Sequence, residues 1–195
     1  MAVAFDLFAR RGYSSVTIKD IAHRLRVNTA LICYYFDSKE DLFRVTLEYF
    51  IRNALQSFRE LEQAHEAPVS MLSAWFSTQA RLASEMRQLV KIMLDYSTSS
   101  TKSKIADAAI SLFHRQEIRI LSSRIQFGID KGIFQPVDVN QAAQIASTHL
   151  DGIMVRSLIH ANFDVRRAIR DFERIFWTYL GYSPSQRKAT KRRKG

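Results

Sequence analysis

Polar helix-capping residues divide this sequence into amphipathic helical segments from its start. Thr17 and Asp20 have the three-residue spacing of a capping box, and apolar residues follow at i, i+3, i+4 and i+7. Asn28 is a good N-cap for the next segment, and Ser38 with Asp41 repeats the capping pattern before a longer one. The spacing predicts helices over residues 2–9, 18–25, 29–36 and 39–63.

The remaining sequence continues this helical pattern. Pro68 suits the first turn of a helix, Gly132 can end one, and Asp138 and Asp164 can act as N-caps. No segment alternates as a strand would, and six glycines and three prolines leave little material for all-β turns. We therefore predict an all-α fold with helices over 68–86, 88–96, 103–131, 139–160 and 165–180, a break near Glu85 and Met86, and a polar loop over 97–101.

The charge is unevenly distributed along the chain. The net charge is +10, but residues 181–195 hold six Lys and Arg and no Asp or Glu. More than half of the excess therefore belongs to the tail, so net charge alone does not indicate nucleic-acid binding. We predict an N-terminal module over residues 1–48, a larger helical domain over 49–181 and a basic, disordered tail over 182–195.

Several classes of protein are disfavoured by the sequence. Cys33 is the single cysteine, so no internal disulfide can form, and the five histidines lack the spacing of a zinc site. No apolar run approaches the ~20 residues of a membrane span. There is no glycine-rich phosphate loop, no GxSxG and no paired-carboxylate motif. We expect a cytoplasmic protein without a metal, cofactor or enzymatic activity.

The segments over 18–25 and 29–36 have the form of a helix-turn-helix. Two short helices joined by a tight turn can place the second helix in the major groove of DNA. The spacing alone fits an ordinary helical hairpin in a protein core equally well. A DNA-binding module and a core hairpin therefore both stay open at this point.

A near-continuous motif in the first 42 residues distinguishes these alternatives. The chain resembles the TetR family of transcriptional regulators at these positions, whereas beyond residue 49 it resembles the family mainly in helix number and length. The resemblance implies a homodimer that binds a pseudo-palindromic operator, most commonly as a ligand-responsive repressor. The matching residues are Ala4-Phe5-Asp6-Leu7-Phe8, Gly12-Tyr13, Val16-Thr17-Ile18, Asp20-Ile21-Ala22, Val27, Ile32-Cys33-Tyr34-Tyr35-Phe36 and Ser38-Lys39-Glu40-Asp41-Leu42.

The resemblance also implies a set of DNA contacts. In the family the third helix enters the major groove, where hydroxyl and aromatic groups can read base edges, while other residues bind phosphate or flanking DNA. Tyr34 as an exposed aromatic and Lys19 as solvated surface charge remain alternatives. The implied base-reading residues are Thr29, Ala30, Cys33 and Tyr34, and the other DNA-binding residues are Thr17, Lys19, Asn28, Tyr35 and Lys39.

Three positions depart from the family pattern. Arg26 stands where the family usually has glycine in the turn, and a left-handed non-glycine residue costs about 1 kcal/mol or somewhat more. Leu31 and Cys33 replace residues that commonly carry a hydroxyl group. Relatives usually have a further turn and a basic arm before the position of Met1, so contacts from such an arm would be missing from this chain.

The larger domain is expected to bind a small, largely apolar effector, because the family encloses a ligand pocket there. We select side chains that combine apolar bulk with a few polar groups. His149 fits either an effector contact or a hydrogen-bonded core histidine. The candidate ligand-binding residues are Trp75, Gln79, Met93, Tyr96, Phe113 and His149.

The resemblance implies a homodimer through the last two helices. We expect Ala142, Ala146 and Gly152 to allow close approach of a second subunit, although packing within one subunit uses the same chemistry. Two rival functions stay open. One is an all-helical enzyme, and the other is a helical dimer that binds small molecules or proteins and has weakened DNA binding.

Overall fold

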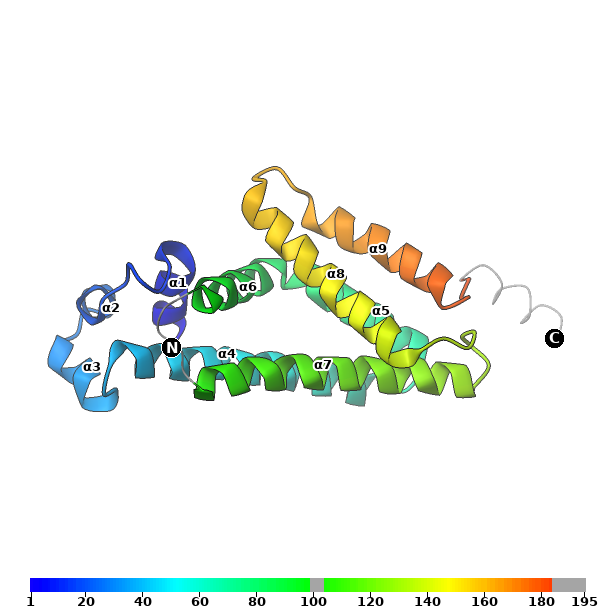
Figure 1. Cartoon of the computed structure of the whole chain (residues 1–195), viewed down its shortest axis with the longest axis horizontal. Helices are drawn as coiled ribbons and strands as arrows, with labels where there is room; N and C mark the ends of the chain where they lie inside the picture. The colour runs from blue at the N-terminus through cyan, green and yellow to red at the C-terminus, as the bar shows by residue number, and fades with distance from the viewer. Residues whose placement is uncertain (99–103, 184–195) are drawn as a thin grey trace. The chain divides into compact units, whose positions relative to one another are not determined.

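The computed structural model describes residues 1–98 and 104–183, and within these ranges the chain is helical without a strand, which confirms the predicted all-α class (Figure 1). Residues 99–101 of the predicted loop, the expected helix start at residue 103 and residues 184–195 of the predicted tail lie outside the described residues. The helices are α1 (Ala2–Arg11), α2 (Ile18–Leu25), α3 (Thr29–Tyr35), α4 (Lys39–Ala64), α5 (Pro68–Arg81), α6 (Ala83–Ser97), α7 (Lys104–Asp130), α8 (Val139–Ile159) and α9 (Val165–Tyr179).

The chain divides into two compact units. The first comprises Met1–Arg59 with Ser84–Gln116, and the second comprises Glu60–Ala83 with the residues from Glu117 onward. Helices α4 and α7 each contribute residues to both units. The predicted boundary after residue 48 falls within α4, so no break in the backbone marks it.

The core of the first unit is an aromatic cluster that fixes α1 and α6 to α4. Phe43 of α4 packs against Phe8 and Tyr13, with ring centroids 5.1 Å and 4.7 Å away, and it stacks on Tyr96 of α6 at 5.7 Å. The Lys91 ammonium of α6 also donates to the Ala9 carbonyl near the end of α1, where the helix dipole favours a cation. Helix α6 is therefore packed against the same aromatic core as the N-terminal module.

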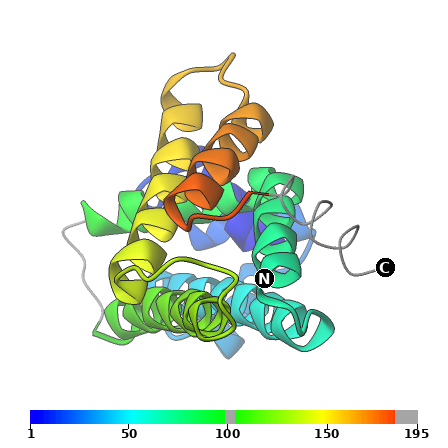
Figure 2. The ribbon, with the colours of Figure 1, turned by 90° about the vertical axis from the view of Figure 1, so that its right-hand side faces the viewer.

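The second unit is built around α9. Phe76 of α5 contacts Phe172 and Phe176 of α9, at centroid distances of 5.9 Å and 5.8 Å. Helix α8 lies beside α9 (Figures 1 and 2). Tyr182, the first residue assigned to the predicted tail, packs against Trp177 at 5.2 Å. The amphipathic pattern of α9 thus buries one face between α5 and α8.

The predicted caps form as their sequence patterns indicate. Thr17 and Asp20 make a reciprocal capping box, and the side chains of Asn28, Asp138 and Asp164 each accept a backbone N–H in the first turn of a helix. These bonds satisfy helical N–H groups that have no partner within the helix. Local chemistry alone therefore sets the starts of four helices.

Two expectations about the larger domain are wrong. The break predicted near Glu85 and Met86 occurs at Leu82, which ends α5 without a glycine or proline to mark it. Ala142 and Ala146 are fully buried within this chain, so they are not available to a second subunit. Of the three small residues expected to allow close approach, only Gly152 faces open space.

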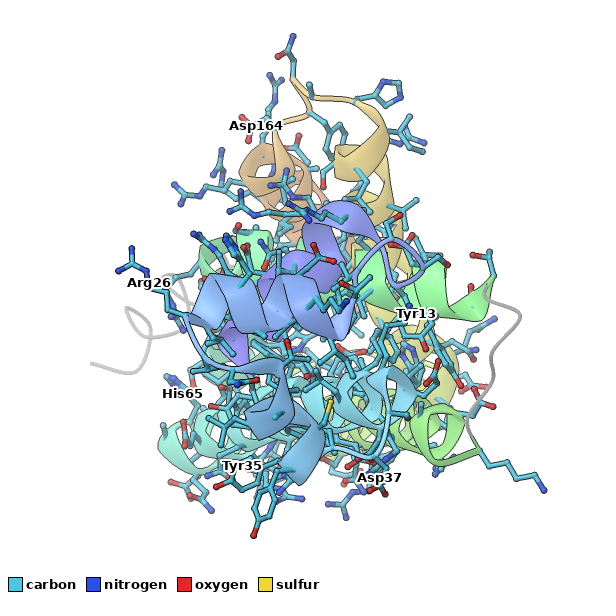
Figure 3. All side chains as sticks on the ribbon, turned by 90° about the vertical axis from the view of Figure 1, so that its left-hand side faces the viewer. Tyr13, Arg26, Tyr35, Asp37, His65 and Asp164 are labelled. Carbon is cyan, nitrogen blue, oxygen red and sulfur yellow. The ribbon has the colours of Figure 1, made fainter. Side chains whose placement is uncertain are left out.

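The turn after α2 holds Arg26 in the left-handed conformation, with φ 57° and ψ 40°. Its side chain points away from the ribbon (Figure 3), so Arg26→Gly should raise the free energy of unfolding by up to about 1 kcal/mol through relief of backbone strain. Arg24→Gly, in the last turn of α2, should lower it by about 1 kcal/mol. Urea unfolding measures both, and a destabilised R26G variant would contradict a strained turn.

Candidate functional site

Helix α3 is attached to the first unit through a single buried side chain. Ile32 is the buried residue of α3, whereas α2 buries Ile21 and Ala22. The turn between the helices is closed by the Val27 N–H, which donates to the Ala22 carbonyl at 3.0 Å. Most of the α3 surface is consequently free to contact another molecule.

The predicted base-reading residues share one side of α3. Thr29 is half-buried, Ala30 and Cys33 are exposed, and Tyr34 is 81% exposed. Positions separated by four residues lie on the same face of a helix, so these four side chains form a continuous surface. An 81% exposed tyrosine ring gains little from burial in its own protein, which favours a role in binding.

Tyr35 lies beside this surface and extends away from the ribbon (Figure 3). It is 67% exposed, and its ring meets the Tyr34 ring edge-on, with centroids 5.1 Å apart. The Tyr35 hydroxyl forms no hydrogen bond with another described residue, so it can donate to an acceptor from outside. This geometry suits the phosphate contact implied by the resemblance.

The start of α2 carries a second group of predicted DNA contacts. The Thr17 hydroxyl already belongs to the capping box, because it donates to Asp20 at 2.5 Å and accepts from the Asp20 N–H at 3.1 Å. This hydrogen bonding lowers the pKa of Asp20 below its ordinary value. Thr17 therefore fixes the start of α2, and the exposed Lys19 side chain supplies a positive charge in the first turn of this helix.

Sequence reasoning missed three basic side chains near Lys19. A hollow of about 320 Å³ between α1 and α2 is lined by Lys19 together with Arg11, His23 and Arg24. Asp20 is its acidic member, and it lies 3.4 Å from Arg11. Lys19 and His23 are four residues apart, so the sequence alone predicts that they share one face of α2. Arg11 lines the same hollow because α1 packs against α2, and this packing could not be predicted from the spacing.

Lys39 lies at the first position of α4 and contacts Tyr13. Its ammonium donates to the Tyr13 carbonyl at 3.1 Å and lies 4.4 Å from the centre of the Tyr13 ring. The Tyr13 hydroxyl donates to Glu40 at 2.7 Å. Burial, followed by this hydrogen bond, raises the pKa of Tyr13, and the same bond lowers the pKa of Glu40. An ammonium has three donors, so Lys39 keeps capacity for a phosphate oxygen.

Replacing Lys39 by alanine should weaken binding to all DNA sequences alike and reduce the slope of log affinity against log salt by about one. Lys91→Ala is a matched control, since Lys91 also donates to a backbone carbonyl of this unit but belongs to α6. Fluorescence anisotropy between 50 and 200 mM salt, roughly the range over which phosphate contacts are resolved, measures both. An unchanged slope for Lys39→Ala would remove it from the phosphate contacts.

The six candidate ligand-binding residues divide between the two units. Trp75 and Gln79 are buried one turn apart on α5, and the Trp75 Nε1 has no hydrogen-bond partner among the described residues. His149 is exposed and stacks on Phe172 with centroids 3.9 Å apart, so it is not a core residue. The others belong to the first unit, where Met93 is half-buried, Tyr96 packs on Phe43 and Phe113 packs on Phe58.

Two negative observations apply to the described part of the chain. It contains no group of three or more His, Cys, Asp or Glu residues placed to hold a metal ion. None of its helices combines the length and the apolar character that crossing a membrane requires.

Comparison with known proteins agrees with this geometry. Residues 1–46 match the family described as bacterial regulatory proteins, tetR family. The HTH-type transcriptional regulator BetI of Brucella suis biovar 1 is 22% identical over 183 residues, which cover 93% of this chain and 90% of that protein. Both the module and the full length of the chain thus have counterparts among transcriptional regulators.

Solved structures extend the similarity in fold. A transcriptional regulator from Saccharomonospora viridis in complex with choline has a TM-score of 0.78 and 24% identity, covering 88% of this chain and 91% of that one. FadR from Bacillus subtilis in complex with stearoyl-CoA has a TM-score of 0.74 and 18% identity, covering 90% and 94%. The helix-turn-helix over α2 and α3 and the family match over residues 1–46 support the assignment of this module to the TetR family of transcriptional regulators.

Proposed function

We propose that this protein is a cytoplasmic, ligand-responsive repressor that binds a pseudo-palindromic operator as a homodimer. The observation that carries the proposal is the outward face of α3, on which Tyr34 is 81% exposed and Ile32 alone is buried. A helix held in this way can enter a major groove without unfolding any part of its own core. The family match supports DNA binding, and repression is the mode that we infer.

Selection of bound fragments from random DNA tests operator binding. We expect enrichment of a sequence with two related half-sites, since a twofold dimer presents two copies of α3 to one duplex. Gel-shift titration of the selected fragment against a scrambled fragment then gives the specificity ratio. Weak binding without sequence preference would contradict the proposal and favour a module that binds small molecules or proteins instead.

The homodimer is proposed to form through α8 and α9. An open groove of about 700 Å³ is lined by α8 residues, among them Ile145, His149 and Gly152. Ile145 is 42% exposed and Ile175 of α9 is 64% exposed, and exposed apolar side chains on neighbouring helices are typical of an interface. A Cβ atom at Gly152 would meet nothing within 4 Å, which leaves space for a second subunit.

A double variant, Ile145→Asp with Ile175→Asp, should sediment as a monomer and lose operator binding, because two buried charges disfavour an apolar interface. Leu94→Asp is the matched control, since Leu94 is 43% exposed on α6, outside the proposed interface. Sedimentation equilibrium measures the mass. A wild-type protein that is monomeric at micromolar concentration would refute the dimer.

We infer that an effector shifts the population away from the DNA-binding form. Useful induction requires a difference in affinity between the two forms of about 1–3 kcal/mol. The unpartnered Trp75 Nε1 and the buried Gln79 amide, one turn apart on α5, favour an apolar effector that carries a hydrogen-bond acceptor. Choline and stearoyl-CoA are bound by similar proteins, so the fold accommodates very different molecules.

A further inference from the structure

A second cavity lies in the first unit, whereas the α5 residues proposed to bind the effector belong to the second unit. It is an open groove of about 430 Å³ between α4 and the first part of α7. Phe58 of α4 stacks on Phe113 of α7, with ring centroids 6.1 Å apart, which holds these helices side by side. The groove has the size of a small-molecule site.

The surface of the groove is largely apolar. Ile51 and Leu55 of α4 are buried beneath it, and Leu112 of α7 is 43% exposed along it. Ala108 and Ala109 add only methyl groups on the α7 side. A hydrocarbon chain placed here would remove the exposed part of Leu112 from water and contact α4 and α7 together.

Two arginines give the groove a positive charge. Arg52 and Arg59 line it from α4. Their backbone positions are two helical turns apart, which is about 10 Å along the helix axis. Neither forms an ion pair or hydrogen bond with any other described residue. The one acidic residue of the groove, Glu48, is already paired with Arg44 at 3.0 Å. The charge left for a ligand is therefore cationic.

We propose that this groove binds an amphipathic monoanion, a straight-chain alkyl carboxylate. Its carboxylate lies between the Arg52 and Arg59 guanidinium groups, which match carboxylate geometry and reach it from opposite sides. Its alkyl chain lies along Leu55 and Leu112. The low wall formed by Ala108 and Ala109 leaves room for a flexible chain.

The groove is connected to the proposed DNA interface through one helix. Helix α4 begins at Lys39 and continues without interruption past Arg59. A ligand between α4 and α7 contacts the same helix that carries the proposed phosphate-binding lysine. An effect of the ligand on DNA affinity rests on the proposed function, whereas binding of the ligand does not.

Isothermal titration of the full-length protein with sodium dodecanoate below its micelle concentration, without DNA, tests the inference. Arg52→Gln combined with Arg59→Gln should weaken binding at least tenfold. Arg87→Gln, at an exposed arginine of α6 in the same unit, should leave it unchanged. Ala109→Trp should also abolish binding by filling the groove, and circular dichroism confirms that each variant is folded.

Chain length and head-group charge provide the decisive comparisons. Octanoate should bind more weakly than dodecanoate by about twofold or more for each methylene removed, up to the roughly fourfold of a fully buried methylene. Dodecyltrimethylammonium should not bind. Three results would overturn the inference. In the first, the cation binds as tightly as dodecanoate. In the second, Trp75→Phe with Gln79→Ala abolishes dodecanoate binding while the double arginine variant keeps it. In the third, the protein binds anionic phosphatidylglycerol vesicles through these arginines but does not bind dodecanoate. Each result is obtained without DNA, so failure of operator binding cannot be mistaken for failure of the groove.

Discussion

Replacing Tyr34 by alanine is expected to weaken operator binding by about 1–3 kcal/mol while leaving affinity for random DNA almost unchanged. Tyr34 is 81% exposed on α3, and its ring meets the Tyr35 ring edge-on. Its removal therefore costs little folding stability. A loss confined to the operator would identify Tyr34 as a base-reading residue.

Tyr49→Ala is the matched control for this measurement. Tyr49 is also an exposed tyrosine that meets a neighbouring aromatic ring edge-on, but it lies on α4 and 44% of it is exposed. Anisotropy titrations at one salt concentration compare both variants on operator and random DNA. Equal losses on the two DNAs would show that Tyr34 contributes to general affinity and reads no base.

The starts of the helices were predictable because capping is a local interaction. Asn28, Asp138 and Asp164 accept backbone N–H groups two or three residues away, so the sequence contains both partners. The left-handed turn at Arg26 followed from the family pattern, and the structure confirms it despite the absence of glycine. These features position the proposed DNA-binding surface.

The break between α5 and α6 was not predictable in the same way. Leu82 ends α5 although it is neither glycine nor proline, so packing rather than propensity places the break. The buried face of α8 is a similar case, because alanines suit both a subunit interface and an internal helix contact. Burial assigns Ala142 and Ala146 to the internal contact.

The site itself was only partly predictable. The exposed positions of α3 follow from the family motif, but the contact of Lys39 with Tyr13 joins residues 26 apart. The ligand candidates were chosen for residue type, and the fold places Trp75 and Gln79 in one unit and Tyr96 in the other. Long-range packing, which one sequence does not encode locally, decides such groupings.

The largest pH effect is expected from Glu117, a carboxyl group buried in the second unit. It is 5% exposed and accepts a hydrogen bond of 2.5 Å from the Ser147 hydroxyl. Burial raises the pKa of Glu117 from 4.5 to about 7, the Ser147 hydrogen bond opposes this rise, and Asp151 adds to it. No cation among the described residues pairs with Glu117 to offset its desolvation.

Between about pH 4.5 and 7 the folded state therefore binds a proton that the unfolded state has released. The contribution of Glu117 to the free energy of unfolding falls as pH rises through this window, by about 3 kcal/mol in total, and is constant above it. Glu117→Gln should remove this dependence, so that the variant gains stability relative to wild type as pH rises. Ser147→Ala removes the bond that favours the charged form, so it should raise the pKa of Glu117 further and extend the loss of stability to higher pH. Urea unfolding at about pH 5, inside the window, and at about pH 8, above it, compares the three proteins, and parallel changes in wild type and Glu117→Gln would mean that the carboxyl group is solvated.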